Sequence, residues 1–250
     1  GDSFIESGEW AEFFHSNLVL NRGNGMSYND LDLSQLNQAA PYIFHGKPCP
    51  KQIWICPSNK MANNSQAVST FKTQLNTLIA TIRNSLKDSG ANTRIVLASC
   101  LPSNNSSANT NYIVEYNAAM EAVADGDSNI DYVDVYTPLV NGTVANTRYY
   151  QDERLAARGY AKMAKTMESK IKEAIPSAYV LSEEQSDAVY DTFNCRTTLA
   201  TTIEGISSIE EGNDAGQFAT ADYGKVKSLL DESLALLGSD ASLTDLQTYN

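Results

Sequence analysis

Apolar residues follow two alternating patterns through residues 10–175. Short, nearly continuous apolar runs are typical of strands buried on both faces of a parallel sheet. Apolar residues at steps of three and four predict amphipathic helices instead. The expected strands cover 17–21, 52–56, 94–101 and 132–136, and the expected helices cover 10–14, 30–44, 66–87, 111–123 and 155–175. Because strands and helices alternate, we expect an α/β domain with a parallel, doubly wound sheet and right-handed crossovers.

The alternation stops after Pro176, and only helical patterns follow. The expected helices cover 183–211, 223–237 and a stretch from residue 242 onward. Ser242 and Asp245 have the spacing of a capping box at the start of the last helix. We therefore expect an α/β domain over 1–176 and a C-terminal helical hairpin or partial bundle over 177–250.

Charge is distributed unevenly along the chain, whose formal net charge is −12. Residues 176–250 hold 13 acidic and 3 basic residues (−10), and residues 1–175 hold 17 acidic and 15 basic residues (−2). Without a basic face to neutralise phosphates, a nucleic-acid partner is not expected. No run approaches the ~18–20 apolar residues that a membrane span requires.

The four cysteines lack the spacing of a metal site, so no metal and no cofactor are expected. Cys56 and Cys100 lie in apolar runs and are interpreted as small core residues. Cys49 and Cys195 lie in loop or helix settings, and the sequence leaves open whether they pair.

The first ten residues carry the most specific motif. Gly1-Asp2-Ser3 is followed by Gly8-Glu9-Trp10 at the start of a helical pattern. This arrangement resembles block I of the SGNH (GDSL-type) hydrolases, in the acetylhydrolase-like branch. The resemblance extends over about 1–175 and implies a flavodoxin-like three-layer sandwich with a parallel sheet, with Ser3 as the nucleophile of an ester-cleaving site. The alternative is that Asp2 or Ser3 only caps a helix.

Two further motifs resemble the family's oxyanion-binding blocks. Asn21-Arg22-Gly23 resembles block II, in which a second glycine offers its backbone N–H to the oxyanion. That position falls on Met26, or on Gly25 if the alignment slips by one residue. Pro57-Ser58-Asn59-Lys60 resembles block III. The resemblance makes Asn59 a side-chain oxyanion donor and places Lys60 where the family has an acid.

The family's catalytic histidine has no counterpart. When block V is anchored on Gly159-Tyr160, the histidine position falls on Arg154. The chain has two histidines, His15 and His45, neither of which lies near that block. A guanidinium stays protonated and does not act as a general base. We therefore expect ester hydrolysis to be impaired, since general-base assistance contributes roughly 10²–10⁴-fold.

The same residues suggest a binding pocket. Arg154 and Lys60, with Ser3 and Asn59, would suit a carboxylate or sulfate. The aromatic rings of Tyr28, Tyr149 and Tyr150 would offer flat faces to a sugar. The alternative is that Arg154 pairs with Asp152 or Glu153 and that the former catalytic site is filled in.

In the family, the Gly-Asp-Ser turn follows a central strand, which is missing before Gly1. We expect the natural chain to continue ahead of Gly1. The alternative is that residues 178–181 fill the slot of this strand.

Three hypotheses for function follow. The first is an impaired SGNH-like protein whose pocket binds a small molecule, glycan or acylated ligand. The second is an active serine ester hydrolase that uses an unusual base. The third is a structural or interaction module whose helical tail binds a protein, because residues 214–218 and the following helix loosely resemble helical-bundle modules of secreted bacterial proteins. An extracytoplasmic location (periplasmic, cell-surface or secreted) is expected in each case.

Overall fold

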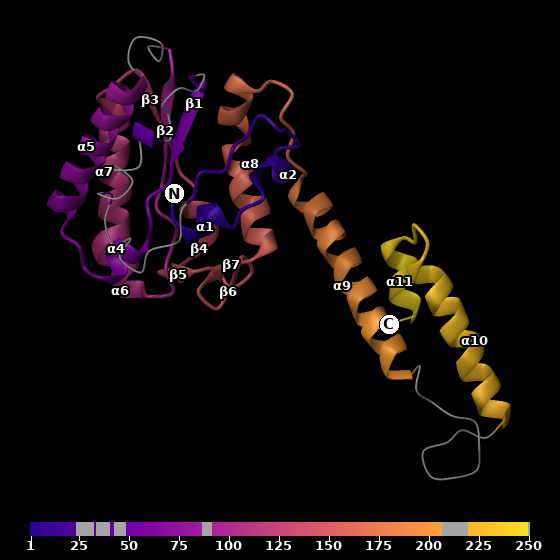
Figure 1. Cartoon of the computed structure of the whole chain (residues 1–250). Helices are drawn as coiled ribbons and strands as arrows, with labels where there is room; N and C mark the ends of the chain where they lie inside the picture. Colours follow the sequence, from indigo (N-terminus) through magenta and orange to yellow (C-terminus); the bar gives the residue numbers. More distant parts are fainter. Residues whose placement is uncertain (24–32, 34–40, 43–48, 87–91, 207–219, 250) are drawn as a thin grey trace. The chain divides into compact units, whose positions relative to one another are not determined.

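The computed structural model describes residues 1–23, 33, 41–42, 49–86, 92–206 and 220–249 (Figure 1). The chain forms two compact units, Gly1–Leu181 and Ser182–Asn250. The first unit has an α/β fold and the second is helical.

Three parallel strands form the sheet of the first unit. They are β1 (Gln52–Ile55), β2 (Arg94–Ala98) and β3 (Ile130–Val133), and they lie in the order β1-β2-β3. Their register pairs Ile53 with Ile95, and Ile95 in turn with Ile130. These are the apolar runs that predicted a parallel sheet, and the α/β fold is confirmed.

Helices cover both faces of this sheet, which makes three layers (Figure 1). One face is covered by α5 (Val68–Leu86) and α7 (Val114–Asp125), whose apolar side chains share a core with the sheet. The other face is covered by α2 (Trp10–Phe13) and α8 (Ala157–Ala174), which share a second core. The stepwise apolar spacing of these helices is what lets each bury one face.

Short elements connect the layers near the carboxyl ends of the strands (Figure 1). They are α1 (Ser3–Glu6), α4 (Lys60–Asn63), α6 (Ser106–Ala108), the π-helical turn η2 (Asn109–Ile113), the 3₁₀ turn η3 (Thr137–Leu139) and the hairpins β4 (Val140–Asn141)–β5 (Val144–Ala145) and β6 (Tyr150–Gln151)–β7 (Arg154–Leu155). In parallel sheets this end is where ligands bind.

Two sequence predictions differ from the structure. Residues 17–21 do not form a strand, and Leu18 and Leu20 are each 71% exposed. A strand needs a neighbouring strand to pair its backbone groups, which an apolar run alone does not provide. The third strand begins earlier than expected and ends at Val133, because Asp134 Oδ1 accepts the N–H groups of Tyr136 and Thr137 and turns the chain. The predicted helix over 30–44 falls largely outside the described residues.

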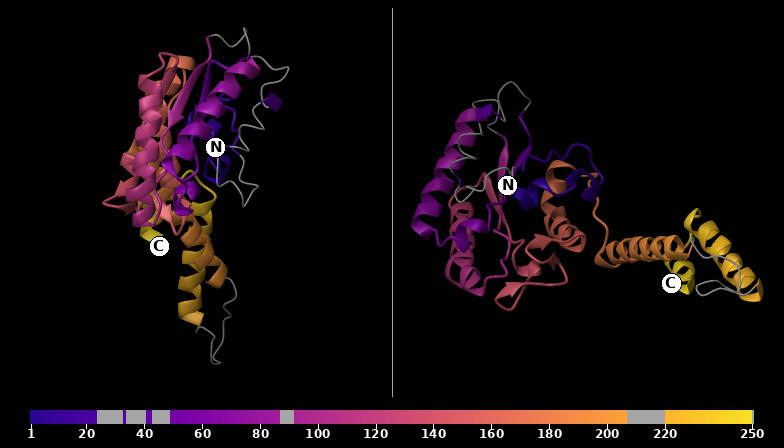
Figure 2. Two further views of the ribbon diagram at one scale, coloured as in Figure 1. Left: turned by 90° about the vertical axis from the view of Figure 1, so that its left-hand side faces the viewer. Right: turned by 60° about the horizontal axis from the view of Figure 1, so that its bottom comes forward.

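The second unit contains α9 (Glu183–Ile206), α10 (Thr220–Leu237) and α11 (Leu243–Tyr249), which Figure 2 shows in two orientations. Among the described residues of this unit, Leu199, Ile203 and Leu246 form a small core. The predicted capping box is present, because Asp245 N–H donates to Ser242 Oγ at 3.3 Å and Ser242 N–H donates to Asp245 Oδ2 at 3.1 Å.

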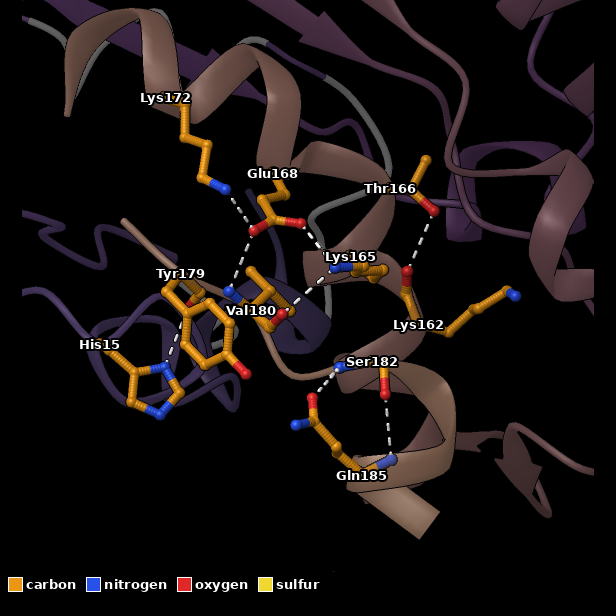
Figure 3. A network of polar contacts seen from close by, with 10 residues as sticks. All are labelled: His15, Lys162, Lys165, Thr166, Glu168, Lys172, Tyr179, Val180, Ser182 and Gln185. Atoms are coloured by element: carbon orange, nitrogen blue, oxygen red, sulfur yellow. Dashed lines mark hydrogen bonds and ion pairs between the residues drawn. The ribbon is translucent and has the colours of Figure 1, made fainter. Parts of the chain in front are cut away.

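Residues 178–181 do not form a strand either. Tyr179 N–H donates to the Phe14 carbonyl at 3.1 Å. Figure 3 shows the Val180 N–H, which donates to the Glu168 carboxylate at 3.2 Å. Ala178 and Val180 are buried in the core beside α8. This segment therefore ties the end of the first unit to α2 and α8 and does not extend the sheet.

No disulfide joins the four cysteines. Cys56 and Cys100 are buried, as expected of core residues. Within the described residues, no helix is long and apolar enough to cross a membrane, and no group of side chains is arranged to hold a metal ion.

Candidate functional site

Asp2 starts the helix that carries Ser3. Its carboxylate Oδ1 accepts the Phe4 N–H at 3.1 Å, which caps α1. Ser3 is therefore the first residue of α1, and its side chain is half-buried. A four-residue helix is not stable alone, so contacts from the rest of the unit must hold it. One of them is the Tyr160 hydroxyl, which donates to the Phe4 carbonyl at 2.8 Å.

The far end of α1 is held by a side chain from the second motif. Asn21 Nδ2 lies within hydrogen-bond distance of the carbonyl oxygens of Ile5 (2.8 Å), Glu6 (2.9 Å) and Gly8 (2.9 Å). The Trp10 indole N–H also donates to the Ile5 carbonyl, at 2.8 Å. Asn21 thus satisfies carbonyls that a short helix leaves unpaired. The sequence motif had marked Asn21 without showing this role.

Gly23 allows the chain to pass against α1. A Cβ at this position would lie 2.2 Å from the Glu6 nitrogen and 2.6 Å from the Glu6 Cα. Backbone atoms cannot yield as a flexible side chain does, so no other residue fits without moving α1. The glycine of the second motif is thus explained by packing.

Lys60 contacts the candidate nucleophile. It is the first residue of α4, and its Nζ donates to Ser3 Oγ at 3.4 Å. Its own N–H donates to Ser58 Oγ at 3.2 Å, which fixes the start of α4. The structure therefore brings Ser3 and Lys60 together, although they are far apart in sequence.

Asn59 is buried beside this pair, at 6% exposure. Its Nδ2 donates to the Pro102 carbonyl at 3.0 Å. The loop that carries Pro102 is fixed in turn by two buried amides, because the Cys100 N–H donates to Asn117 Oδ1 and the Ser103 N–H donates to Asn109 Oδ1. An amide nitrogen has two hydrogens, and the second one of Asn59 has no hydrogen-bond acceptor among the described residues.

Tyr150 does not offer the open ring expected for a sugar. The side chain is 6% exposed, and its ring packs edge-on against Phe4 with centroids 6.5 Å apart. Its hydroxyl is buried and has no hydrogen-bond partner among the described residues. Burial, with smaller contributions from Cys56 and Asp2, raises the pKa of this hydroxyl above its ordinary value. Tyr150 therefore packs against Phe4 of α1 and does not present an open flat surface.

Arg154 lies on β7, at the far strand of the β6–β7 hairpin, and is exposed. The hairpin is joined to α1 through the Phe4–Tyr150 contact and to the loop after β2 through a hydrogen bond from Asn104 Nδ2 to the Asp152 carbonyl. Among the described residues Arg154 makes no ion pair, either with Asp152 or with Glu153. It also makes no hydrogen bond to Ser3 there.

His15 contacts Tyr179. Its Nδ1 lies 2.8 Å from the Tyr179 carbonyl, and its ring lies against the Tyr179 ring with centroids 5.3 Å apart (Figure 3). His45, Gly25, Met26 and Tyr28 lie outside the described residues. No imidazole among the described residues is therefore in reach of the Ser3 hydroxyl.

Asp2 contributes a buried charge beneath the site. Its Oδ2 is buried and has no partner among the described residues. Its charge adds to burial in raising the pKa of the Cys56 thiol to about 12 and that of the Tyr160 hydroxyl to about 12. Both neighbours therefore stay protonated near neutral pH.

Comparisons with known proteins bear on the fold. No protein-family model matches the sequence, and no curated protein matches it. Several solved structures are similar. A GDSL-like lipase from Bacteroides thetaiotaomicron VPI-5482 is 20% identical, with a TM-score of 0.55, over 70% of this chain and 86% of that one. A candidate acylhydrolase from Bacteroides fragilis NCTC 9343 is 21% identical, with a TM-score of 0.56, over 69% and 84%. A candidate platelet activating factor from Streptococcus pneumoniae is 20% identical, with a TM-score of 0.57, over 68% and 81%.

The chain has an SGNH (GDSL-type) hydrolase-like fold. In this SGNH-like fold, Ser3, Asn59 and Lys60 meet where the first motif, β1 and the loop after β2 come together. Identities near one residue in five show the fold alone, so the activity has to be argued from the site.

Proposed function

We propose that this SGNH-like protein binds an anionic or acylated small molecule, such as a carboxylate, a sulfated glycan or an acylated sugar, and hydrolyses esters poorly. The observation that carries the proposal is the partner of Ser3. Its hydroxyl faces the amine of Lys60 at 3.4 Å, and no described imidazole lies near it. The site therefore has a cation where serine hydrolases hold a base suited to neutral pH.

Poor hydrolysis follows from the chemistry of the base. A serine hydroxyl becomes a good nucleophile when a neighbouring group takes its proton. Imidazole suits this role because it is largely neutral at pH 7, whereas lysine side chains in general are protonated there. Without a matched base, the residual rate comes from the oxyanion donors and from binding.

Ligand binding is supported by the donors that remain. Lys60 supplies a charge, and Ser3 and the second hydrogen of the Asn59 amide supply neutral donors. Arg154 supplies a second cation from the adjoining hairpin. Hydrogen bonds from charged donors to an anion are about twice as strong as neutral ones, so an anionic group is the favoured ligand.

Calorimetric titration with sodium sulfate and sodium acetate tests the binding. We expect Lys60→Met to weaken anion binding by roughly 10–100-fold, which corresponds to one charged hydrogen bond. Lys72→Met is the matched control, because Lys72 is an exposed lysine of α5. Equal affinity in Lys60→Met and the wild type would contradict the proposed pocket.

Turnover of p-nitrophenyl acetate tests the impairment. We expect kcat far below the ordinary enzyme range of about 1–10³ s⁻¹. A kcat within that range that disappears in Ser3→Ala would contradict impaired hydrolysis.

We also propose that the protein acts outside the cytoplasm. Fractionation of the native cells, with an antibody against the chain, tests this location. Recovery of the chain in the cytosolic fraction alone would contradict it.

A further inference from the structure

We infer that Ser3 and Lys60 form a slow nucleophile–base dyad, in which the minor neutral form that lysine side chains have near pH 7 accepts the hydroxyl proton as Ser3 Oγ attacks an acyl carbonyl. The inference rests on the proposed function, since it requires that the site admits an acylated ligand. It goes further by assigning a base to a site that has no described imidazole.

The distance between the two groups suits this role. Lys60 Nζ lies 3.4 Å from Ser3 Oγ. Contacts between nucleophile and base are often longer before a ligand binds and tighten when it does. The backbone of both residues is also fixed, because Asp2 caps the helix of Ser3 and the Ser58 hydroxyl accepts the Lys60 N–H. Little rearrangement is needed to shorten the contact.

The contacts of Lys60 leave its amine available to Ser3. Among the described residues its Nζ has Ser3 as its only hydrogen-bond partner, and it forms no ion pair with a carboxylate. Lys165 and Lys172, in contrast, both form ion pairs with Glu168 at 2.7 Å. A carboxylate in direct contact would hold the amine in its charged form, and no described carboxylate, that of Asp2 included, forms an ion pair with Lys60.

The reactants of the proposed reaction are an ester and water. Lys60 Nζ takes the proton of Ser3 Oγ, and the oxygen forms a bond to the carbonyl carbon. The bond from that carbon to the leaving oxygen breaks, and Lys60 returns the proton to that oxygen. The result is an alcohol and an acyl-Ser3. Water then attacks the acyl carbon, Lys60 takes its proton and passes it to Ser3 Oγ, and a carboxylic acid leaves. Asn59 donates its second amide hydrogen to the oxyanion in both steps.

Covalent labelling of the full chain tests the dyad without requiring turnover. We expect an ethoxy fluorophosphonate probe to add once to the wild type, with the adduct on Ser3 by peptide mass spectrometry. Lys60→Met should lower the labelling rate by roughly 10²–10⁴-fold, the contribution of a general base. Lys60→Arg should lower it equally, because a guanidinium keeps the charge and does not accept a proton. Lys72→Met should label as the wild type does, and Ser3→Ala should not label.

The arginine variant separates the dyad from the binding pocket. We expect Lys60→Arg to keep the sulfate affinity that Lys60→Met loses, because the positive charge is retained. Labelling of Lys60→Arg at the wild-type rate would overturn the dyad and leave Lys60 as a cation only. A wild type that binds sulfate and does not label would overturn the dyad alone. A wild type that neither binds nor labels would overturn both proposals. Unchanged circular dichroism and melting temperature of each variant establish that it is folded.

Discussion

Asn21 shows how a single side chain positions the candidate nucleophile. Its amide nitrogen lies 2.8 to 2.9 Å from three carbonyl oxygens at the end of α1, and its two hydrogens can serve two of them. We expect Asn21→Leu to lower the free energy of unfolding by about 1–3 kcal/mol, because it removes the hydrogen bonds that the Asn21 amide donates to carbonyls at the end of α1. Urea denaturation followed by circular dichroism measures the change.

Asn17→Ala is the matched control for this prediction. Asn17 belongs to the same segment and is exposed. Its replacement should change the free energy of unfolding by no more than about 0.5 kcal/mol. If the two variants are equally stable, the hydrogen bonds of Asn21 do not hold α1.

Substitution by alanine should change stability in opposite directions at two glycines, Gly23 and Gly224. At Gly23 the new Cβ would lie 2.2 Å from the Glu6 nitrogen, so Gly23→Ala must displace α1 and lower the melting temperature. At Gly224, inside α10, nothing lies within 4 Å of the new Cβ. Gly224→Ala should therefore stabilise the second unit by about 1 kcal/mol through helix propensity. Thermal melts of both variants test the pair, and a neutral Gly23→Ala would show that α1 tolerates a shift.

At the scale of the element, α8 holds the segment that ends the first unit. The pKa of the Glu168 carboxyl is lowered to about 2 by three hydrogen bonds (Figure 3). In order of their effect, the donors are Lys165, Lys172 and the Val180 N–H. A carboxyl whose pKa is lowered on folding stabilises the folded state while it is ionised. That stabilisation is present above the ordinary value of 4.5 and is lost as the pH falls toward about 2.

The pH dependence of unfolding tests this linkage. We expect the wild type to lose stability between about pH 4.5 and pH 2, and Glu168→Gln to lose less over the same window. At pH 7 the variant should be the less stable protein. Denaturant midpoints measured at pH 7, 4 and 2.5 give the comparison. Parallel curves for the two proteins would show that Glu168 does not contribute to this loss.

The sequence predicts the strands and helices whose own apolar spacing marks a buried face. It does not predict features that depend on contacts with a neighbouring segment. Strands β1 and β2 and the long helices follow from their own apolar spacing. Residues 17–21 carry the same apolar signal, and they do not form a strand because none of the described strands pairs with them. The end of β3 at Val133 does not follow from the apolar pattern either, since Asp134 ends the strand through side-chain hydrogen bonds.

The candidate site is predictable only in part for the same reason. The motifs marked Ser3, Asn59 and Lys60 one by one, and the structure brings them together. The contact between Lys60 and Ser3 depends on how α1 and α4 dock, which no local pattern contains. The burial of Tyr150 depends on Phe4 packing against it. The sequence therefore predicted an exposed ring for a sugar where the structure has a buried one.

At the scale of the whole molecule, the two units differ in how much core they bury. The first unit has two large clusters of buried residues. The described core of the second unit consists of Leu199, Ile203 and Leu246, with partly buried residues around them. Such a small core makes each of its members important, because little else offsets the entropy lost on folding.

Leu199 and Phe193 lie on the same helix and should differ sharply in their effect. Leu199 is 1% exposed, whereas Phe193 is 65% exposed on α9. Leu199→Ala should lower the stability of the second unit by about 2–5 kcal/mol, the usual cost of a cavity at a buried leucine. Phe193→Ala should change it by no more than about 0.5 kcal/mol. Urea denaturation of the full chain measures both. If Phe193→Ala proves as costly as Leu199→Ala, then Phe193 is covered in solution by a contact that the described residues of its own unit do not supply.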